Sequence, residues 1–244
     1  MPVMKVGPGR ALLYSGIQTY DQKVLATGPI AYWPLWETSG VVAECLVNPA
    51  QNGTYSSNVA TWPVGAGIGD GNTAPGFDGT NDWIDIDTAA FVASFNTSTG
   101  TALIWTRVVN AGIWTDGNPH HAWHIYRGVN DRVQQSKRVT NNNVQQIHKG
   151  SGVFAIINNA GHAETDWTCW ALTWNVGGNL IAYIGGAQDG PATPGVTAWA
   201  GPVVTAQIGS DTAAPTFPWH GWLAHCAFWN RVLAPAEILA LATV

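Results

Sequence analysis

The sequence predicts an all-β protein, a sandwich or barrel of many short strands, and three observations support this. Short apolar and aromatic runs recur from Ile30 onward, separated by Gly, Pro, Asn and Asp, as in strands joined by turns. No run long enough for an amphipathic helix appears before the C-terminal end. The chain has 244 residues, 46% of them hydrophobic, which suffices for the core of one large β domain.

Residues 1–29 are predicted to form an extended N-terminal arm, because Gly and Pro interrupt them and the apolar patches between are short. One sandwich domain is expected to follow over residues 30–244. Its expected strands lie near residues 30–36, 82–86, 101–109, 122–127, 131–139, 153–158, 167–175, 179–184, 203–209 and 219–230.

Two of these strands indicate how their faces are covered. Within 170–174, Trp170, Leu172 and Trp174 fall on one face, as in a half-buried strand. The run 219–230 is apolar on both faces, so we expect it to be covered on both sides. Strict alternation places Trp219, Leu223, Ala227 and Trp229 on one face and Trp222, Cys226 and Phe228 on the other.

The C-terminal end predicts one short helix that closes the domain. Pro235 suits the first helical position and Glu237 the first turn. Ile238, Leu239 and Leu241 follow at a spacing that can pack against the β-structure.

The composition excludes some classes of function. Charged residues make up 10% of the chain and the net charge is −5, which argues against binding to nucleic acid phosphates. No segment approaches the 18 apolar residues of a membrane span. The fourteen Trp residues exceed what a core needs, so we expect some on a binding face or subunit interface. Three cysteines without a CxxC pair predict buried, reduced thiols.

Four aspartates, Asp78, Asp82, Asp85 and Asp87, cluster in one short stretch. A calcium loop of the EF-hand type starting at Asp78 would need Gly at position 83 and Glu at position 89, which are Trp and Ala here. Residues 78–81 are turn formers, and the strand that follows points its isoleucines inward and Trp83, Asp85 and Asp87 outward. We interpret this stretch as a turn and a solvated strand face, with a cation or ligand site as the alternative.

No catalytic or metal site is expected elsewhere. His120, His121 and His124 lack the Glu of a zinc-protease motif, and alternation would put His120 and His124 on one face. Sandwich glycosidases carry three spaced carboxylates on one strand, and the nearest match, Glu164 and Asp166, has Cys169 in the third position. We therefore expect a protein that is not an enzyme and needs no cofactor; calcium is possible in principle but unsupported.

Several separated segments resemble one known pattern. They are IAYWPLWETSG at 30–40, FDGTNDWIDI at 77–86, TALIWTRV at 101–108, and the region 170–242 that closes with an aromatic-Asn-Arg-x-Leu turn into the helix. This order resembles the laminin-G-like members of the concanavalin A-like lectin/glucanase superfamily. The resemblance implies a jelly roll of two packed antiparallel sheets, and mostly sugar or protein binding.

Three functions remain open. The first is a structural or interaction protein on a virion surface, a phage capsid decoration or tail component, with residues 1–29 and the aromatic surface binding copies of itself or capsid or tail proteins. The absence of an export signal fits such a protein, made in a host cytoplasm; otherwise we expect a cytoplasmic protein. The alternative is a carbohydrate-binding module, and a glycosidase is a distant third. The ligand-binding residues of the carbohydrate-binding module would be Trp83, Asp85, Asp87, Trp114, Trp123 and Trp199.

Overall fold

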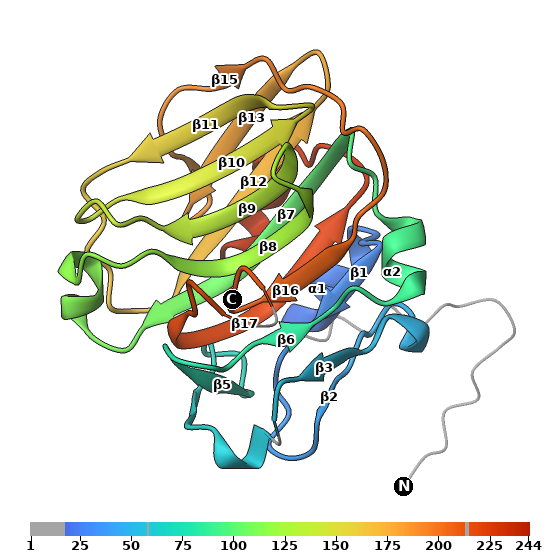
Figure 1. Cartoon of the computed structure of the whole chain (residues 1–244). Helices are drawn as coiled ribbons and strands as arrows, with labels where there is room; N and C mark the ends of the chain where they lie inside the picture. Colours follow the sequence, from blue (N-terminus) through green and yellow to red (C-terminus); the bar gives the residue numbers. More distant parts are fainter. Residues whose placement is uncertain (1–17, 58, 213–214) are drawn as a thin grey trace, which may run out of the picture.

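The computed structural model describes residues 18–57, 59–212 and 215–244. Within these residues two antiparallel sheets pack face to face, as Figure 1 shows. We call one the helix-covered sheet, because helices lie on its outer face, and the other the groove sheet. The predicted fold class, a two-sheet antiparallel sandwich with a short C-terminal helix, is confirmed.

From one edge to the other, the helix-covered sheet consists of β14 (Ala187–Gln188), β13 (Asn179–Ile184), β12 (Thr168–Asn175), β7 (Thr99–Val108), β17 (His220–Trp229), β5 (Thr73–Asp78) and β4 (Val64–Ala66), with β1 (Ala31–Trp33) paired to β17 and β15 (Thr193–Pro194) to β13. The groove sheet consists, in order, of β11 (Val153–Asn159), β10 (Val144–Gly150), β9 (Asp131–Lys137), β8 (His120–Gly128), β16 (Thr205–Ile208), β6 (Ile84–Asp85), β3 (Gly53–Tyr55) and β2 (Val42–Ala43). The helices are α1 (Tyr20–Ala26), α2 (Ala89–Ser94) and α3 (Pro235–Leu241), with short 3₁₀ turns η1 (Pro49–Gln51), η2 (Val59–Thr61) and η3 (Ala111–Thr115).

Two apolar clusters hold these layers together. The larger fills the space between the sheets, and the smaller lies between the helix-covered sheet and helices α1 and α3. Most of the tryptophans belong to these clusters, and Trp33, Trp123, Trp170, Trp174, Trp219 and Trp229 are almost completely buried. The surplus of aromatic side chains therefore serves mainly the interior, because a Trp ring removes more apolar area from water than other side chains.

The predicted extended arm is wrong for residues 20–26, which form helix α1. Thr19 and Gln22 make a capping box at its start, and the Tyr20 hydroxyl donates a 2.6 Å hydrogen bond to the Leu241 carbonyl. Tyr20 and Val24 are buried against the helix-covered sheet. This helix is too short to show a repeating apolar pattern in the sequence. It forms because it packs against the sheet, and this packing cannot be predicted from the local sequence. Residues 1–17 of the predicted arm lie outside the described residues.

Strand β10 was not predicted, and neither were helix α2 and the short strands β2 to β5. In β10, Gln146 and His148 are buried although polar, so the strand lacks the apolar alternation that marks a half-buried strand. Helix α3 begins at Pro235, as expected. Although Ala234 has no capping side chain, its backbone N–H donates a 2.8 Å hydrogen bond to the Glu237 carboxylate.

A bulge in β17 corrects the predicted faces of this strand. His225 has a φ of +53°, and the pairing with β7 shifts between Ala224 and Ala227. Beyond the bulge, Cys226 and Phe228 join Leu223 and Trp219 between the sheets, while Ala227 and Trp229 face the helices. An inserted residue reverses the alternation of the strand. The expectation that both faces are covered is confirmed.

Candidate functional site

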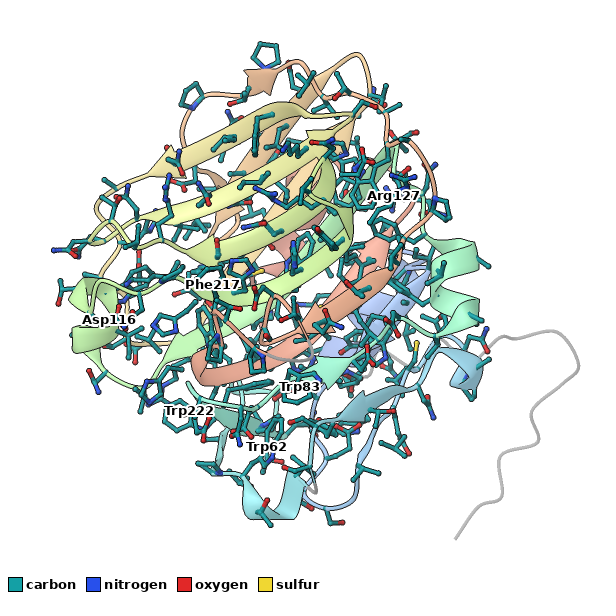
Figure 2. All side chains as sticks on the ribbon, viewed as in Figure 1. Trp62, Trp83, Asp116, Arg127, Phe217 and Trp222 are labelled. Carbon is teal, nitrogen blue, oxygen red and sulfur yellow. The ribbon has the colours of Figure 1, made fainter. Side chains whose placement is uncertain are left out.

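The outer face of the groove sheet carries a hollow with a volume of about 350 Å³. Its floor consists of side chains from β8, β9 and β10, and Asp211 and Phe217 from the segment between β16 and β17 line it as well. Figure 2 shows Phe217 in front of these strands. This volume lies within the range of small-molecule sites, about 300–1,000 Å³.

Strand register explains why polar groups gather here. His124 pairs with Gln134 on one side and with Gln207 on the other, and Gln134 pairs with Ile147. A second row places Tyr126 beside Arg132 and Arg132 beside Lys149. Cross-strand partners project from the same face, so these residues form two adjacent polar rows.

A bulge in β8 brings two histidines into this face. The pairing with β9 shifts between His121 and Trp123, so His121 and His124 lie side by side, with ring centroids 5.3 Å apart. The predicted pairing of His120 with His124 is therefore wrong. His120 instead contacts the Asp116 carboxylate at 2.7 Å, at the end of the strand.

His124 lines the groove and carries a hydrogen-bond acceptor without a partner. Its Nδ1 lies 2.7 Å from the Asp211 carbonyl oxygen, which can only accept, so Nδ1 carries the proton. Burial lowers the pKa of His124 to about 4, against the raising effect of that carbonyl. The ring is neutral at pH 7, and its buried Nε2 is an acceptor with no partner among the described residues.

The neighbouring ring of His121 is also neutral, because burial lowers its pKa well below the ordinary value. Its Nδ1 is buried and lacks a partner among the described residues. The ring stacks on Phe217 at a centroid distance of 5.4 Å. His121 therefore offers one more unused polar atom beside an aromatic surface.

The position of Phe217 is fixed by Asp211. The Asp211 carboxylate accepts hydrogen bonds from the backbone N–H groups of Thr216 (2.9 Å) and Phe217 (3.1 Å). The Phe217 carbonyl accepts from the His121 backbone N–H at 3.0 Å. Asp211 thus supports the wall of the groove, and its carboxylate is already engaged.

Arg132 brings a charge to the groove. Burial lowers the pKa of its guanidinium, but an arginine remains protonated in proteins. The guanidinium lies 5.2 Å from the Phe154 ring centroid, and Nε is buried with no hydrogen-bond partner among the described residues. It is a buried donor without a partner, on a side chain that lines the groove.

Three of the predicted ligand-binding residues lie beside this groove, on or next to β6. Asp85 and Asp87 are partly exposed, while Ile84 and Ile86 are buried, as strand alternation predicts. Trp83 is partly exposed and lies beside β6 in Figure 2. The Asp85 carboxylate accepts a 3.3 Å hydrogen bond from Gln207, the strand neighbour of His124. Burial and the adjacent Asp85 raise the pKa of Asp87 to about 6.

The other three predicted residues, Trp114, Trp123 and Trp199, lie in the core, with exposures of 3%, 0% and 8%. The expectation that they would stack on a ligand from the surface is wrong for these three. Trp123 follows the β8 bulge, which turns its ring inward to donate a 2.7 Å hydrogen bond to Gln135. Trp114 donates to the Glu164 carbonyl at 2.9 Å.

Sequence reasoning missed most of the groove, including Tyr126, Arg132, Gln134 and Phe217. One signal was present, since Arg132, Gln134 and Ser136 alternate along β9. The intervening Gln135 and Lys137 are also polar, yet they are completely buried. Because both faces of this part of β9 carry polar side chains, its sequence lacks the usual contrast between a polar and an apolar face.

Metal binding and membrane spans can be assessed for the described part of the chain. No group of three or more His, Cys, Asp or Glu side chains there is placed to hold a metal ion. None of its helices is long and apolar enough to cross a bilayer. The three cysteines are free and buried, as predicted.

No protein-family model and no curated protein matches the chain, but solved structures do. Domain 4 of AbnA, a GH43 extracellular arabinanase from Geobacillus stearothermophilus in complex with arabinotriose, is 15% identical with a TM-score of 0.62. The match covers 88% of this chain and 98% of that domain.

Two larger proteins contain a similar unit. The receptor-binding domain of botulinum neurotoxin mosaic serotype C/D is 11% identical with a TM-score of 0.64, over 88% of this chain and 50% of that one. Trypanosoma rangeli sialidase in complex with sialic acid is 15% identical with a TM-score of 0.63, over 88% of this chain and 33% of that one. This chain thus spans about half and a third of their lengths. These matches support the β-sandwich fold.

Proposed function

We propose that this chain is a carbohydrate-binding module that holds a saccharide in the groove without cleaving it. One observation carries the proposal: unpartnered buried polar atoms and aromatic surfaces meet in one hollow. His124 Nε2 accepts, Arg132 Nε–H donates, and Phe217 and Tyr126 lie beside them. A sugar hydroxyl both donates and accepts, and the C–H face of a sugar ring packs on an aromatic ring.

The energetics favour an occupant with hydroxyl groups. A buried polar atom without a partner costs about 1–3 kcal/mol, and the groove contains several of them. A ligand that satisfies these atoms recovers this free energy, whereas an apolar ligand leaves them unpaired. Polar selectivity of this kind rejects analogues that lack the matching hydroxyl.

The arabinanase domain supports the proposal further. The match covers 98% of that domain, and its structure was solved with arabinotriose, so a domain of this fold and size takes a saccharide. The sialidase complex contains sialic acid, but the matched unit is only a third of that protein. The arabinanase domain is therefore the more direct parallel.

The acidic groups favour binding without turnover. Hydrolysis of a glycosidic bond commonly uses two carboxylates that flank it. Among the described residues that line the groove, Asp211 carries the single carboxylate, and backbone N–H groups already occupy it. We therefore keep the proposal of a protein that is not an enzyme.

A virion-surface role, self-association through residues 1–29 and a laminin-G-like relationship stay predictions. They are compatible with the groove, because a saccharide-binding module on a particle surface would serve for attachment. Size-exclusion chromatography with light scattering tests self-association: a strict monomer that binds no particle protein would count against that role.

A broad glycan array, run with calcium and with a chelator, tests saccharide binding. We expect at least one class of glycan to bind in both conditions. Gln134→Ala, which alters the groove floor, should weaken the best glycan about tenfold in titration calorimetry. The matched Gln188→Ala lies on the exposed strand β14 and should leave the affinity unchanged. The proposal fails if no glycan binds or if both variants bind like the wild type.

A further inference from the structure

Cationic side chains gather on one half of the groove sheet's outer face. Arg132 and Arg138 line the groove, and Lys149 is the strand neighbour of Arg132. The Lys149 ammonium and the Arg132 guanidinium lie 4.3 Å and 5.2 Å from the ring of Phe154. The whole chain has only 10 Lys and Arg residues and a net charge of −5, so three of them on or directly after two adjacent strands stand out against the composition.

None of these three cations forms an ion pair within the described part of the chain. By contrast, Arg127 pairs with Asp131, Lys137 with Asp116 and Arg231 with Glu237. The hydrogen bonds of the Arg138 and Lys149 side chains go to neutral oxygens, the Asn158 amide at 3.5 Å and the Val129 carbonyl at 2.6 Å. Their charges are uncompensated by side chains.

The carboxylates of this face are either already engaged or lie away from these cations. Asp211 is engaged by backbone N–H groups. Asp85 and Asp87 lie on or next to β6, which is three strands from β9, with β8 and β16 between them. The face is therefore divided into an acidic end at β6 and a cationic half over β9 and β10.

From this division we infer that the groove takes an acidic saccharide, whose carboxylate or sulfate group lies against Arg132. The inference rests on the proposed function and narrows the class of its ligand. A guanidinium forms charge-assisted, often bidentate hydrogen bonds with carboxylate and sulfate oxygens, and these are stronger than bonds between neutral groups. The partly exposed guanidinium of Arg132, which forms no ion pair among the described residues, supplies such bonds while the sugar hydroxyls bond to the neutral floor.

Matched pairs of saccharides test the charge requirement. The probes are oligogalacturonate with its methyl ester, and a chondroitin sulfate oligosaccharide with its desulfated form. We expect the acidic member of at least one pair to bind at least tenfold more tightly than its neutral partner in titration calorimetry. Arg132→Gln should reduce this ratio to below about twofold.

The control is Arg107→Gln, which changes the net charge equally. Arg107 lies on the helix-covered sheet with its guanidinium 5.0 Å from the ring of Trp222, and this variant should retain the ratio. The inference is overturned if acidic and neutral members bind alike, if Arg132→Gln keeps the ratio, or if polyglutamate binds as tightly as the acidic sugar. Equal binding leaves the proposed function intact, whereas binding of no saccharide in these pairs or on the array removes both.

Discussion

The outer faces of the two sheets have opposite characters. On the helix-covered sheet, Trp105, Trp229 and Tyr183 are buried beneath α1 and α3. On the groove sheet, the corresponding face carries His124, Gln134 and other polar groups around an open hollow. One sandwich therefore buries apolar side chains on one outer face and keeps the other largely polar.

The helices account for this difference. Antiparallel sheets can tolerate water on one face, and a sheet becomes apolar outside only where another element covers it. Tyr20 of α1 shows how the helices attach to this sheet. Its hydroxyl accepts a hydrogen bond from Trp105 of β7 and donates one to the Leu241 carbonyl at the end of α3. In the described part of the chain no helix packs over β8 to β10 (Figure 1), and the outer side chains of these strands are mostly polar.

The largest expected effect concerns the covered face. Trp229→Ala removes a ring that is 1% exposed and whose N–H donates to Thr27 at 3.0 Å. We expect the free energy of unfolding to fall by about 3–5 kcal/mol, as for other large-to-small core changes. Urea denaturation followed by fluorescence measures it.

Phe217→Ala on the open face is the matched truncation. It should lower the free energy of unfolding by less than half as much while reducing saccharide binding. Equal losses of stability in the two variants would contradict the contrast between the faces.

Removing the buried charge of Lys137 should have the next largest effect. Lys137 is completely buried in the groove sheet and pairs with Asp116. Lys137→Met leaves the carboxylate without its main partner, and we expect a loss of about 1–3 kcal/mol. Denaturation at pH 7 checks this, with Lys149→Met as the exposed control that changes stability little.

Acid titration of Asp116 is a second test of the ion pair between Lys137 and Asp116. Burial alone would raise its pKa, but the hydrogen bonds from Lys137 and His120 outweigh burial and lower the pKa to about 2. The pair therefore stabilises the fold above about pH 4, and this contribution is lost as the pH falls toward 2. In Lys137→Met, this acid-dependent loss should be smaller; an unchanged profile would contradict the assignment.

A smaller effect is expected from His124 on the open face. With a folded-state pKa of about 4 and an ordinary value near 6.5, the unfolded chain takes up the proton first. Stability should therefore decline as the pH falls from about 6.5 to about 4. Saccharide affinity should hold until His124 protonates near pH 4 and loses its acceptor. Denaturation and calorimetry between pH 7 and 4 test this; His124→Gln should flatten the stability profile.

The smallest effect concerns the acidic end of the open face. The raised pKa of Asp87, about 6, means that its ionised form is disfavoured in the fold at pH 7. Asp87→Asn should therefore raise the melting temperature slightly at pH 7, and the difference should vanish near pH 3, below the ordinary pKa of about 3.9, where Asp87 is neutral in both the folded and the unfolded chain. Thermal melts at the two pH values measure it. A loss of folding in Asp87→Asn would show that this stretch has a further structural role.

The sequence by itself determined the local features of the fold. Alternation places Ile84 and Ile86 inside and Asp85 and Asp87 outside, and the proline at 235 marks the start of α3. Such features depend on near neighbours in the chain, through the two-residue period of a strand and the preferred first positions of a helix. For this reason the sandwich could be predicted from one sequence.

Only the tertiary structure decided the groove. The bulges at His121–Trp123 and at His225 reverse the alternation, so the sequence assigned Trp123 to the wrong face. Helix α1 forms where its few apolar side chains meet the sheet. The groove itself depends on the register of β8, β9 and β10 and on Phe217, whose carbonyl accepts a hydrogen bond from His121 in a distant part of the chain. Contacts between residues far apart in the chain determine these features, and no local pattern records them.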